Sequence, residues 1–471
     1  MVAVSDLPRR AVTRSAKLAS LPLGFAGRTA LGVGKRTFGK SAEAVAMEIQ
    51  QRTAEQLFKV LGELKGGAMK LGQMLSIFEA ALPPEIAGPY RATLTRLQEA
   101  APPLPASTVH QVLAEALGED WRDRFQEFDD RPAAAASIGQ VHRAVWADGR
   151  DVAVKVQYPG AGKALISDFN QLARLGRLFG VLMPGLDVKS MLTELKERVI
   201  EELDYTVEAE SQTITREGFP ADDPDFYIPE VVAQAGNVLV SEWIDGTPLS
   251  KIISDGDQET RDHAALLYCR FLLSGPSRCG LLHGDPHPGN FRLLPDGRLG
   301  VLDFGAVDRI PEEFQYRMGR LLRIGTLDDI DEIEAALRDE DFIREGVEVD
   351  IEGLEAFLAP ITEPFVTETF KFNREWLRDM AARVTDLRPT NVVRQLNLPP
   401  QYVIVHRVLS AGTGVLCQLE CEIPARAESL RWVSGFADEA DAADAADAAA
   451  DAAAELDEAV GSGEGEPEPV A

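Results

Sequence analysis

Two short motifs at a fixed separation constrain this chain more than any other feature. In the first, residues 283–290, Asp285 and Asn290 stand five positions apart on a loop that two prolines restrict. In the second, residues 303–305, an Asp-Phe-Gly sequence begins with Asp303, eighteen positions after Asp285. A strand–turn–strand predicted over residues 291–302 would bring the three side chains to one site. Carboxylate and amide oxygens are the ligands that Mg²⁺ prefers, so the motifs predict a metal site.

Transfer of a phosphoryl group from ATP needs such a site, together with a lysine for the phosphates. Lys155 lies in a Val-Ala-Val-Lys-Val segment, where alternation along a strand predicts a half-buried side chain that needs a counter-ion. The acidic helix predicted around residues 201–205 offers glutamates for this pairing. Taken singly, Lys155 could be a surface residue and these acids a solvated helix face. The coincidence of the lysine with both motifs, in the order of a protein kinase, favours an ATP site.

The order of predicted elements is that of a two-lobed α+β fold like the protein kinases. Residues 141–146 and 151–157 are β-branched runs joined by Asp148-Gly149, a strong hairpin signal. Two further strands are expected, and apolar residues at helical spacing fill most of the remainder. The expected strands are 228–232 and 238–244, and the expected helices include 41–81, 107–118, 166–182 and 188–215.

The loop expected to cover the phosphates departs from the glycine-rich pattern of protein kinases. Alanines occupy two of the three glycine positions, which should stiffen the loop and change nucleotide affinity or selectivity. The expected nucleotide-binding residues in and near this loop are Ala134, Ala136, Ser137, Gly139 and Val141.

With these residues in view, the chain resembles the UbiB-type (AarF-domain) atypical kinases. The resemblance runs from about Lys65 to Ala306 and weakens toward Arg431. It rests on the alanine-rich loop, on Glu202-Leu203-Asp204, which looks like the family's E-x-D element, and on residues 70–73, which match its K-x-G-Q signature.

The resemblance implies roles for particular residues. Lys155 would pair with Glu202 and hold phosphate, Asn290 and Asp303 would bind Mg²⁺, and Asp285 would be the catalytic-loop aspartate. Adenine would meet backbone groups at residues 241–244, including those of Glu242 and Ile244. Three further residues, on the helical extension and in the E-x-D element, would be regulatory: Lys70, Gln73 and Asp204.

The resemblance also implies what the enzyme acts on. In the family the N-terminal helical extension covers the active site and occupies space that a protein substrate would use. The chain has no Ala-Pro-Glu sequence after Asp303-Phe304-Gly305, so the segment that would dock a protein substrate looks short. Family members are linked to isoprenoid-quinone or other lipid metabolism, and a lipid or isoprenoid compound is therefore the expected small-molecule partner.

These features predict five regions along the chain. In order they are a basic flexible arm (1–40), an N-terminal helical extension with the K-x-G-Q motif (41–124), an N-lobe (125–245), a helical C-lobe (246–436) and an acidic Ala/Asp-rich tail (437–471).

Charge and composition limit the partners. The net charge of −28 argues against a general affinity for nucleic acid, which needs clustered Lys and Arg. The four cysteines are too few for a disulfide scaffold in a chain of 471 residues, so reduced thiols in a cytoplasmic protein are expected. No apolar run predicts a transmembrane helix. Eight Lys or Arg in residues 1–40 suit peripheral contact with a membrane, and a solvated arm is the alternative. The oligomeric state is not readable from the sequence.

Three functions are compatible with these residues. The first is an Mg-ATP-dependent atypical kinase or ATPase in lipid or quinone metabolism. The second is a small-molecule phosphotransferase of the antibiotic-modifying type, which shares the catalytic loop and the metal aspartate. The third is a non-catalytic regulator in which ATP shifts the helix that carries Lys70.

Overall fold

The computed structural model describes residues 103–136, 138–160, 162, 203–327, 329–385 and 391–437. Predictions for the basic arm, for most of the helical extension and for the acidic tail lie outside these residues. Four of the predicted site residues also lie outside them: Lys70, Gln73, Ser137 and Glu202.

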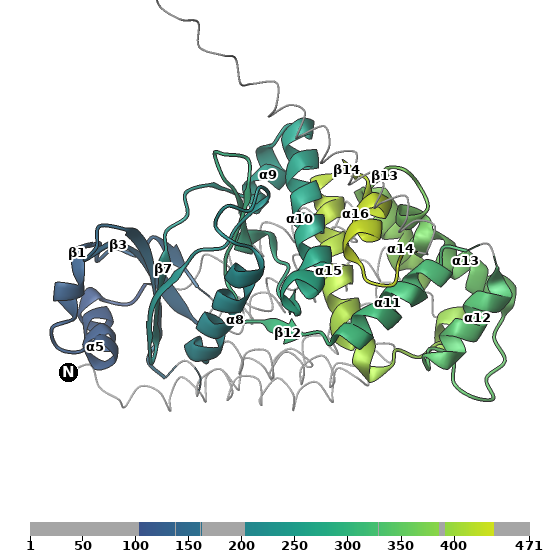
Figure 1. Cartoon of the computed structure of the whole chain (residues 1–471), viewed down its shortest axis with the longest axis horizontal. Coiled ribbons are helices and arrows are strands. Elements are labelled where there is room, and N and C mark those ends of the chain that lie inside the picture. The colour runs from purple at the N-terminus through teal and green to yellow at the C-terminus, as the bar shows by residue number, and fades with distance from the viewer. Residues whose placement is uncertain are drawn as a thin grey trace, which may run out of the picture.

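An antiparallel sheet forms the N-lobe, at the left of Figure 1, with strand order β1-β3-β4-β7-β6 and β2 paired to β3. The predicted hairpin is confirmed as β3 and β4, whose connecting turn places Gly149 at a φ of +93°. A positive φ suits glycine because it lacks a Cβ. The strands are β1 (Phe125–Phe128), β2 (Ala134–Ala135), β3 (Gly139–Trp146), β4 (Asp151–Gln157), β6 (Val231–Ala235) and β7 (Val238–Glu242).

Helix α5 (Ala106–Leu117) packs on this sheet, followed by η3 (Trp121–Arg124). Its residues Val109 and Leu113 are fully buried and share one hydrophobic core with Val152 and Val154 of β4. Burial of such side chains contributes roughly 1.5–3 kcal/mol each. The helix that the sequence pattern grouped with the N-terminal extension therefore belongs to the packing of the N-lobe.

The chain crosses between this sheet and a second sheet three times, in two passages. Helix α8 (Tyr205–Gly218) leads into β5 (Phe226–Tyr227), which joins a second sheet of order β5-β11-β10-β8 before the chain returns to β6. After β7 the chain passes again, through residues 243–246, to β8 (Thr247–Pro248) in that same sheet. The remaining strands of the sheet are β10 (Phe291–Leu293) and β11 (Leu299–Val301).

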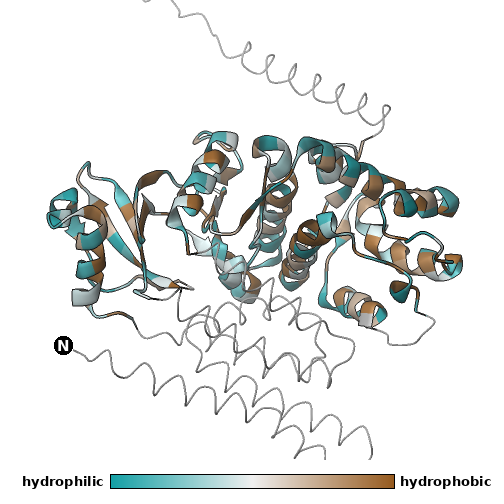
Figure 2. Ribbon diagram, turned by 90° about the horizontal axis from the view of Figure 1, so that it is seen from below, coloured by the Kyte–Doolittle hydropathy of each residue, from teal (hydrophilic) through white to brown (hydrophobic). Residues whose placement is uncertain are grey.

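Helices make up most of the C-lobe, at the right of Figure 1. The central helix α10 starts at the N-cap Asp257 and ends at Gly280, whose φ of +70° allows a left-handed C-cap. In Figure 2 hydrophobic residues gather on the strands and on one side of many helices, as expected for elements that bury one face. The helices are α9 (Leu249–Asp255), α10 (Gln258–Cys279), α11 (Glu312–Ile324), α12 (Ile330–Asp339), α13 (Ile351–Thr362), α14 (Arg374–Thr385), α15 (Val403–Leu419) and α16 (Ala425–Trp432).

Short elements complete the C-lobe. Strand β9 (Leu281–His283) pairs with β12 (Val307–Arg309), and β13 (Phe370–Lys371) pairs with β14 (Glu422–Ile423). The 3₁₀ turns are η4 (Pro288–Asn290), η5 (Glu363–Phe365), η6 (Val392–Arg394) and η7 (Pro400–Tyr402). The order of sheets and helices confirms the expected two-lobed α+β, kinase-like fold.

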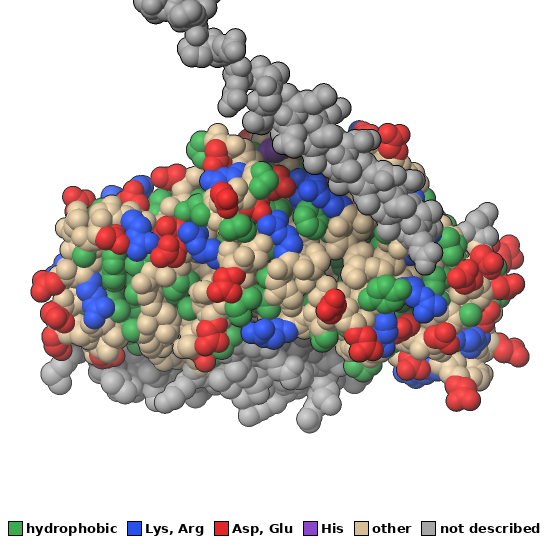
Figure 3. Space-filling view, in the orientation of Figure 1, with side chains coloured by type: hydrophobic (Ala, Val, Ile, Leu, Met, Phe, Trp, Pro, Cys, Tyr) green, Lys and Arg blue, Asp and Glu red, His purple; other side chains and the backbone are tan. Residues whose placement is uncertain are grey.

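One helical stretch of the described chain, Pro400–Leu419, is long and apolar enough to cross a membrane by composition alone. Its most apolar window is 61% buried inside the protein, and Val408 and Val415 are fully buried in the C-lobe core. This is the burial of a core helix. On the face drawn in Figure 3, acidic and basic side chains are interspersed among apolar ones.

Candidate functional site

Lys155 lies between two carboxylates on different elements. Its Nζ donates a hydrogen bond to Glu208 Oε1 of α8 at 2.6 Å and lies 3.5 Å from Asp303 Oδ1. Burial by itself lowers the pKa of a lysine, but the Asp303 and Glu208 carboxylates outweigh it and hold the pKa of Lys155 well above its usual value. The lysine is therefore a fixed positive charge at the junction of the lobes.

Within the described residues the glutamate that pairs with Lys155 is Glu208, whereas the expected partner, Glu202, lies outside them. Helix α8 begins at Tyr205, after its N-cap Asp204, and the residue that it directs at Lys155 is Glu208. Glu208 was missed, although a signal exists. It shares a buried face with Tyr205, Ala209 and Gln212 at helical spacing, and an acid on a buried face needs a partner.

Asp204, predicted as a regulatory residue, caps this helix. Its carboxylate accepts a hydrogen bond from the Thr206 backbone N–H at 2.9 Å. An N-cap of this kind contributes about 1 kcal/mol to helix stability. It therefore supports the helix that carries Glu208.

Short-range hydrogen bonds bring the two opening motifs together. Asn290 Nδ2 donates to the Asp285 carbonyl at 3.1 Å, and the Asn290 carbonyl accepts from the Leu302 N–H at 2.7 Å. Gly284 N–H donates to the Ala306 carbonyl at 2.7 Å. The segments that carry Asp285, Asn290 and Asp303 thus lie side by side in the structure.

Asp303 has an unusual backbone conformation, with a φ of +61°. Non-glycine residues at positive φ are uncommon and cluster at functional sites, where the surrounding structure holds them. Here the Gly305 N–H donates to Asp303 Oδ1 at 3.2 Å, and His283 Nε2 donates to the Asp303 carbonyl at 2.8 Å. These contacts fix the direction of the carboxylate.

Both loop histidines are structural. His283 Nε2 is occupied by the Asp303 carbonyl, and burial lowers the pKa of His283, against the opposing effect of Asp285 and Asp303. His287 Nδ1 accepts a hydrogen bond from the Gly289 N–H at 3.1 Å. One ring nitrogen of each histidine is therefore engaged with the backbone of the loop.

Two residues that support the Asp285 loop were not predicted. Tyr268 of α10 is fully buried and donates from its hydroxyl to the Pro286 carbonyl at 2.6 Å. Arg407 of α15 donates from Nη2 to the Gly284 carbonyl at 3.2 Å. No local signal marks either residue, because each comes from a helix distant in sequence.

The donor set fits a magnesium ion. The side-chain nitrogen Nδ2 of Asn290 already donates to the protein. This leaves the side-chain oxygen Oδ1 to act as a ligand beside the Asp303 carboxylate. In the described part of the chain, no group of three or more His, Cys, Asp or Glu side chains could hold a metal by itself. Mg²⁺ usually combines one or two protein carboxylates with water and substrate phosphates.

The described residues of the alanine-rich loop are placed beside Lys155 by strand pairing. Ala134 of β2 pairs with Val141, which itself lies opposite Lys155 on β4. Ala136 N–H donates to the Gly139 carbonyl at 2.9 Å. A Cβ at Gly139 would lie 2.4 Å from the Val156 carbonyl oxygen, so the one retained glycine is required by packing.

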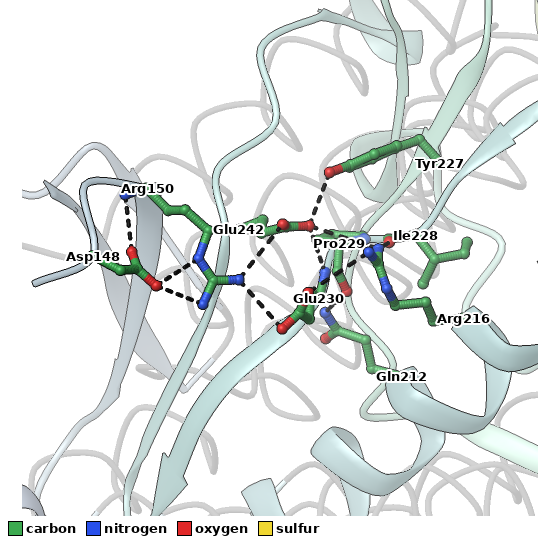
Figure 4. A network of polar contacts seen from close by, with 9 residues as sticks. All are labelled: Asp148, Arg150, Gln212, Arg216, Tyr227, Ile228, Pro229, Glu230 and Glu242. Carbon is green, nitrogen blue, oxygen red and sulfur yellow. Dashed lines mark hydrogen bonds and ion pairs between the residues drawn. The ribbon is translucent and has the colours of Figure 1, made fainter. Parts of the chain in front are cut away.

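The predicted adenine-binding segment lies at the end of β7. The Glu242 N–H donates to the Glu230 carbonyl and the Trp243 N–H to the Asp151 carbonyl, each at 3.0 Å. Ile244 is buried. The Glu242 carboxylate turns toward Tyr227 and joins the polar network in Figure 4.

Comparison with known proteins gives consistent matches. The family model described as the ABC1 atypical kinase-like domain matches residues 96–337. The Caenorhabditis elegans protein named atypical kinase coq-8, mitochondrial, is 30% identical over 437 residues, which cover 89% of this chain and 57% of the relative. The Dictyostelium discoideum protein named probable serine/threonine-protein kinase abkA is 30% identical over 79% of this chain and 68% of the relative. The chain thus spans little more than half of the first relative.

A solved structure is also similar. The Rv3197–erythromycin complex from Mycobacterium tuberculosis is 44% identical, with a TM-score of 0.64 over 84% of this chain and all of that one.

Proposed function

Because the chain belongs to the ABC1 atypical kinase-like family, we propose that it binds Mg-ATP between its lobes and hydrolyses or transfers the γ-phosphate. The observation that carries this proposal is the meeting of Lys155, Glu208 and Asp303 beside the loop of Asp285 and Asn290. A fixed cation, a metal-binding pair and a second aspartate are the parts that phosphoryl transfer requires.

Each residue has a proposed part. Lys155, held by Glu208, binds phosphate oxygens. Asn290 and Asp303 hold Mg²⁺, which when bound would neutralise charge on the phosphates. Asp285 faces the acceptor or the attacking water and accepts its proton. The loop of Ala134, Ala136, Ser137, Gly139 and Val141 covers the phosphates, and the backbone of Glu242 and Ile244 receives adenine.

The proposed acceptor class is a lipid or isoprenoid-quinone compound. The support is the resemblance, the absence of an Ala-Pro-Glu sequence after Gly305, and relatives with the name atypical kinase. Several of those relatives are named mitochondrial. For this chain we propose a cytoplasmic enzyme that contacts a membrane peripherally through its basic arm. The Dictyostelium relative is instead named a probable serine/threonine-protein kinase. A turnover assay with Mg-ATP and a generic protein as acceptor tests whether this chain phosphorylates protein.

The central experiment is an Mg-ATP binding and turnover assay of Asp303→Asn. The variant keeps the size of the side chain and removes the charge that would bind metal, so Mg²⁺-dependent nucleotide binding and turnover should be lost. Asp296→Asn, in the exposed turn between β10 and β11, is the matched control and should behave as the wild type. Normal Mg-ATP turnover by Asp303→Asn would refute the assignment.

A second candidate is binding or phosphorylation of a macrolide antibiotic. It is favoured by the erythromycin complex of the similar Mycobacterium tuberculosis protein. Calorimetric titration with erythromycin, followed by mass spectrometry of erythromycin incubated with Mg-ATP and protein, separates the cases. Saturable binding with no phosphorylated product would support a binding site alone. A product heavier by one phosphoryl group would make the protein a phosphotransferase.

A further inference from the structure

The carboxylate of Glu242 contacts both passages of the chain between the lobes. One passage runs from α8 through β5 to β6, and the other from β7 through residues 243–246 to β8. Glu242 ends β7, at the start of the second passage. Its Oε2 accepts hydrogen bonds from the Tyr227 hydroxyl and from the Glu230 N–H, both at 2.8 Å and both on the first passage (Figure 4).

One arm of this network reaches α8. Arg216 of α8 lies 3.6 Å from Glu242 Oε2 through Nη1 and donates from the same nitrogen to the Ile228 carbonyl. Gln212, one turn earlier, donates to the Pro229 carbonyl at 2.7 Å. The same helix carries Glu208, which holds Lys155. The position of α8 is therefore connected to Glu242 by side chains that the site itself does not use.

The other arm reaches the strand before Asp303. Tyr227 lies in β5, which pairs in parallel with β11 and sets Tyr227 opposite Gly300. Asp303 follows β11 by two residues. The two arms meet again where Lys155 Nζ lies 3.5 Å from Asp303 Oδ1, so the network and the site form a closed loop of contacts.

The charges around Glu242 explain why it can anchor both arms. Its side chain is 18% exposed, and Arg150 Nη1 and Arg216 Nη1 lie 3.8 and 3.6 Å from its two oxygens. Glu230 contacts the same two arginines at 3.2 and 3.7 Å but is 47% exposed. Hydrogen bonds to an ionised acceptor are stronger than neutral ones, and more so away from water.

We propose that Glu242 is a positioning residue: its carboxylate holds α8 and β5 in register and thereby sets Lys155 against Asp303 for nucleotide binding. The consequence for nucleotide rests on the proposed function, but the mechanical part does not. Adenine that meets the backbone at residues 242–244 would lie next to the Glu242 carboxylate. A change at this adenine-binding segment would therefore alter the phosphate site, and the reverse.

Hydrogen–deuterium exchange of the full chain without nucleotide tests the mechanical part. Glu242→Gln should raise exchange about tenfold in α8 and in residues 226–230, because charge-assisted hydrogen bonds become neutral. Exchange in α15, remote from the network, should not change. Glu230→Gln is the matched control: it removes a carboxylate from the same arginines and leaves the tie to β7, so its effect should be less than about twofold. Tyr227→Phe, a milder change, should loosen residues 226–230 more than α8.

Several results would overturn the proposal. These are equal exchange in Glu242→Gln and the wild type, an equal rise in Glu230→Gln and Glu242→Gln, or a rise spread evenly through α15, which would indicate general destabilisation. Mg-ATP titration of the same variants tests the functional part, with a tenfold weaker affinity expected for Glu242→Gln alone. If the wild type does not bind Mg-ATP, the proposed function fails while the exchange result still stands or falls by itself.

Discussion

At the scale of single residues, the pairing of Lys155 decides how firmly phosphate would be held. Glu208→Gln keeps the shape of the side chain and removes its charge, so Mg-ATP affinity should fall roughly ten- to hundredfold, the value of a charge-assisted hydrogen bond. Isothermal titration measures it. Glu210→Gln, at an exposed position of the same helix, is the control. Wild-type affinity in Glu208→Gln with lost affinity in Glu202→Gln would instead favour Glu202, the partner that the resemblance implies.

Buried histidines give the protein a pH-dependent stability. Burial lowers the pKa of His283 and of His142, whereas a histidine in the unfolded chain titrates near 6.5. The unfolded state therefore binds protons first as the pH falls. The stability that the neutral histidines contribute should be fully present above about pH 7. The free energy of unfolding should decrease as the pH falls through 6.5 toward the lowered pKa values of the folded state.

Urea denaturation between pH 8 and pH 5 measures this dependence. His142→Gln, which removes a buried ring hydrogen-bonded to the Asp129 carbonyl, should flatten the curve, and His263→Gln at an exposed position should leave it unchanged. A curve in His142→Gln that keeps the full slope would show that His142 does not contribute.

At the scale of elements, the alanine-rich turn is the part most open to a change in selectivity. Ala136 lies on a turn that is closed by its N–H bond to the Gly139 carbonyl. Ala136→Gly widens the accessible φ and ψ, so backbone N–H groups should approach phosphate more closely and ATP affinity, or the preference between ATP and ADP, should change. Titrations with each nucleotide measure this, with Ala147→Gly in the β3–β4 turn as control. Unchanged titrations would remove this account of the alanines, and Ala134→Gly would repeat the test.

At the scale of the whole molecule, Arg270 joins distant segments of the C-lobe. From α10 it donates to both Glu428 oxygens of α16, at 2.8 and 2.7 Å, and to Asp225 at 2.7 Å. The Glu428 side chain is only 6% exposed.

Removing the cation would leave the buried Glu428 carboxylate with the Trp432 indole N–H but without a positive charge beside it. Arg270→Ala should therefore lower the free energy of unfolding by about 3–5 kcal/mol. Arg320→Ala, at an exposed position of α11, should change it by less than about 0.5 kcal/mol. Chemical denaturation compares them. A loss below about 1 kcal/mol in Arg270→Ala would mean that the network does not hold α16 in place.

Much of the fold was predictable because its signals are local. The β3–β4 hairpin follows from β-branched runs around Asp148-Gly149. The strands expected at 228–232 and 238–244 are β6 and β7, which agree to within a few residues. The predicted end of the helix 188–215 lies within a few residues of the end of α8 at Gly218, and residues 188–202 of that prediction lie outside the described part of the chain. Burial of α5 in the N-lobe core also escaped prediction, because amphipathic spacing identifies a face but not what covers it.

By itself, the sequence determined that the segments of Asp285, Asn290 and Asp303 lie close together, because a short hairpin and two prolines leave the chain few ways to separate them. It also determined that Lys155 stands on a strand of the opposite lobe. Only the tertiary structure decided that Glu208 holds this lysine, that Tyr268 and Arg407 brace the loop, and that Glu242 ties the two passages between the lobes. These contacts join residues far apart in the chain, and their choice depends on how whole elements pack, which no local spacing encodes.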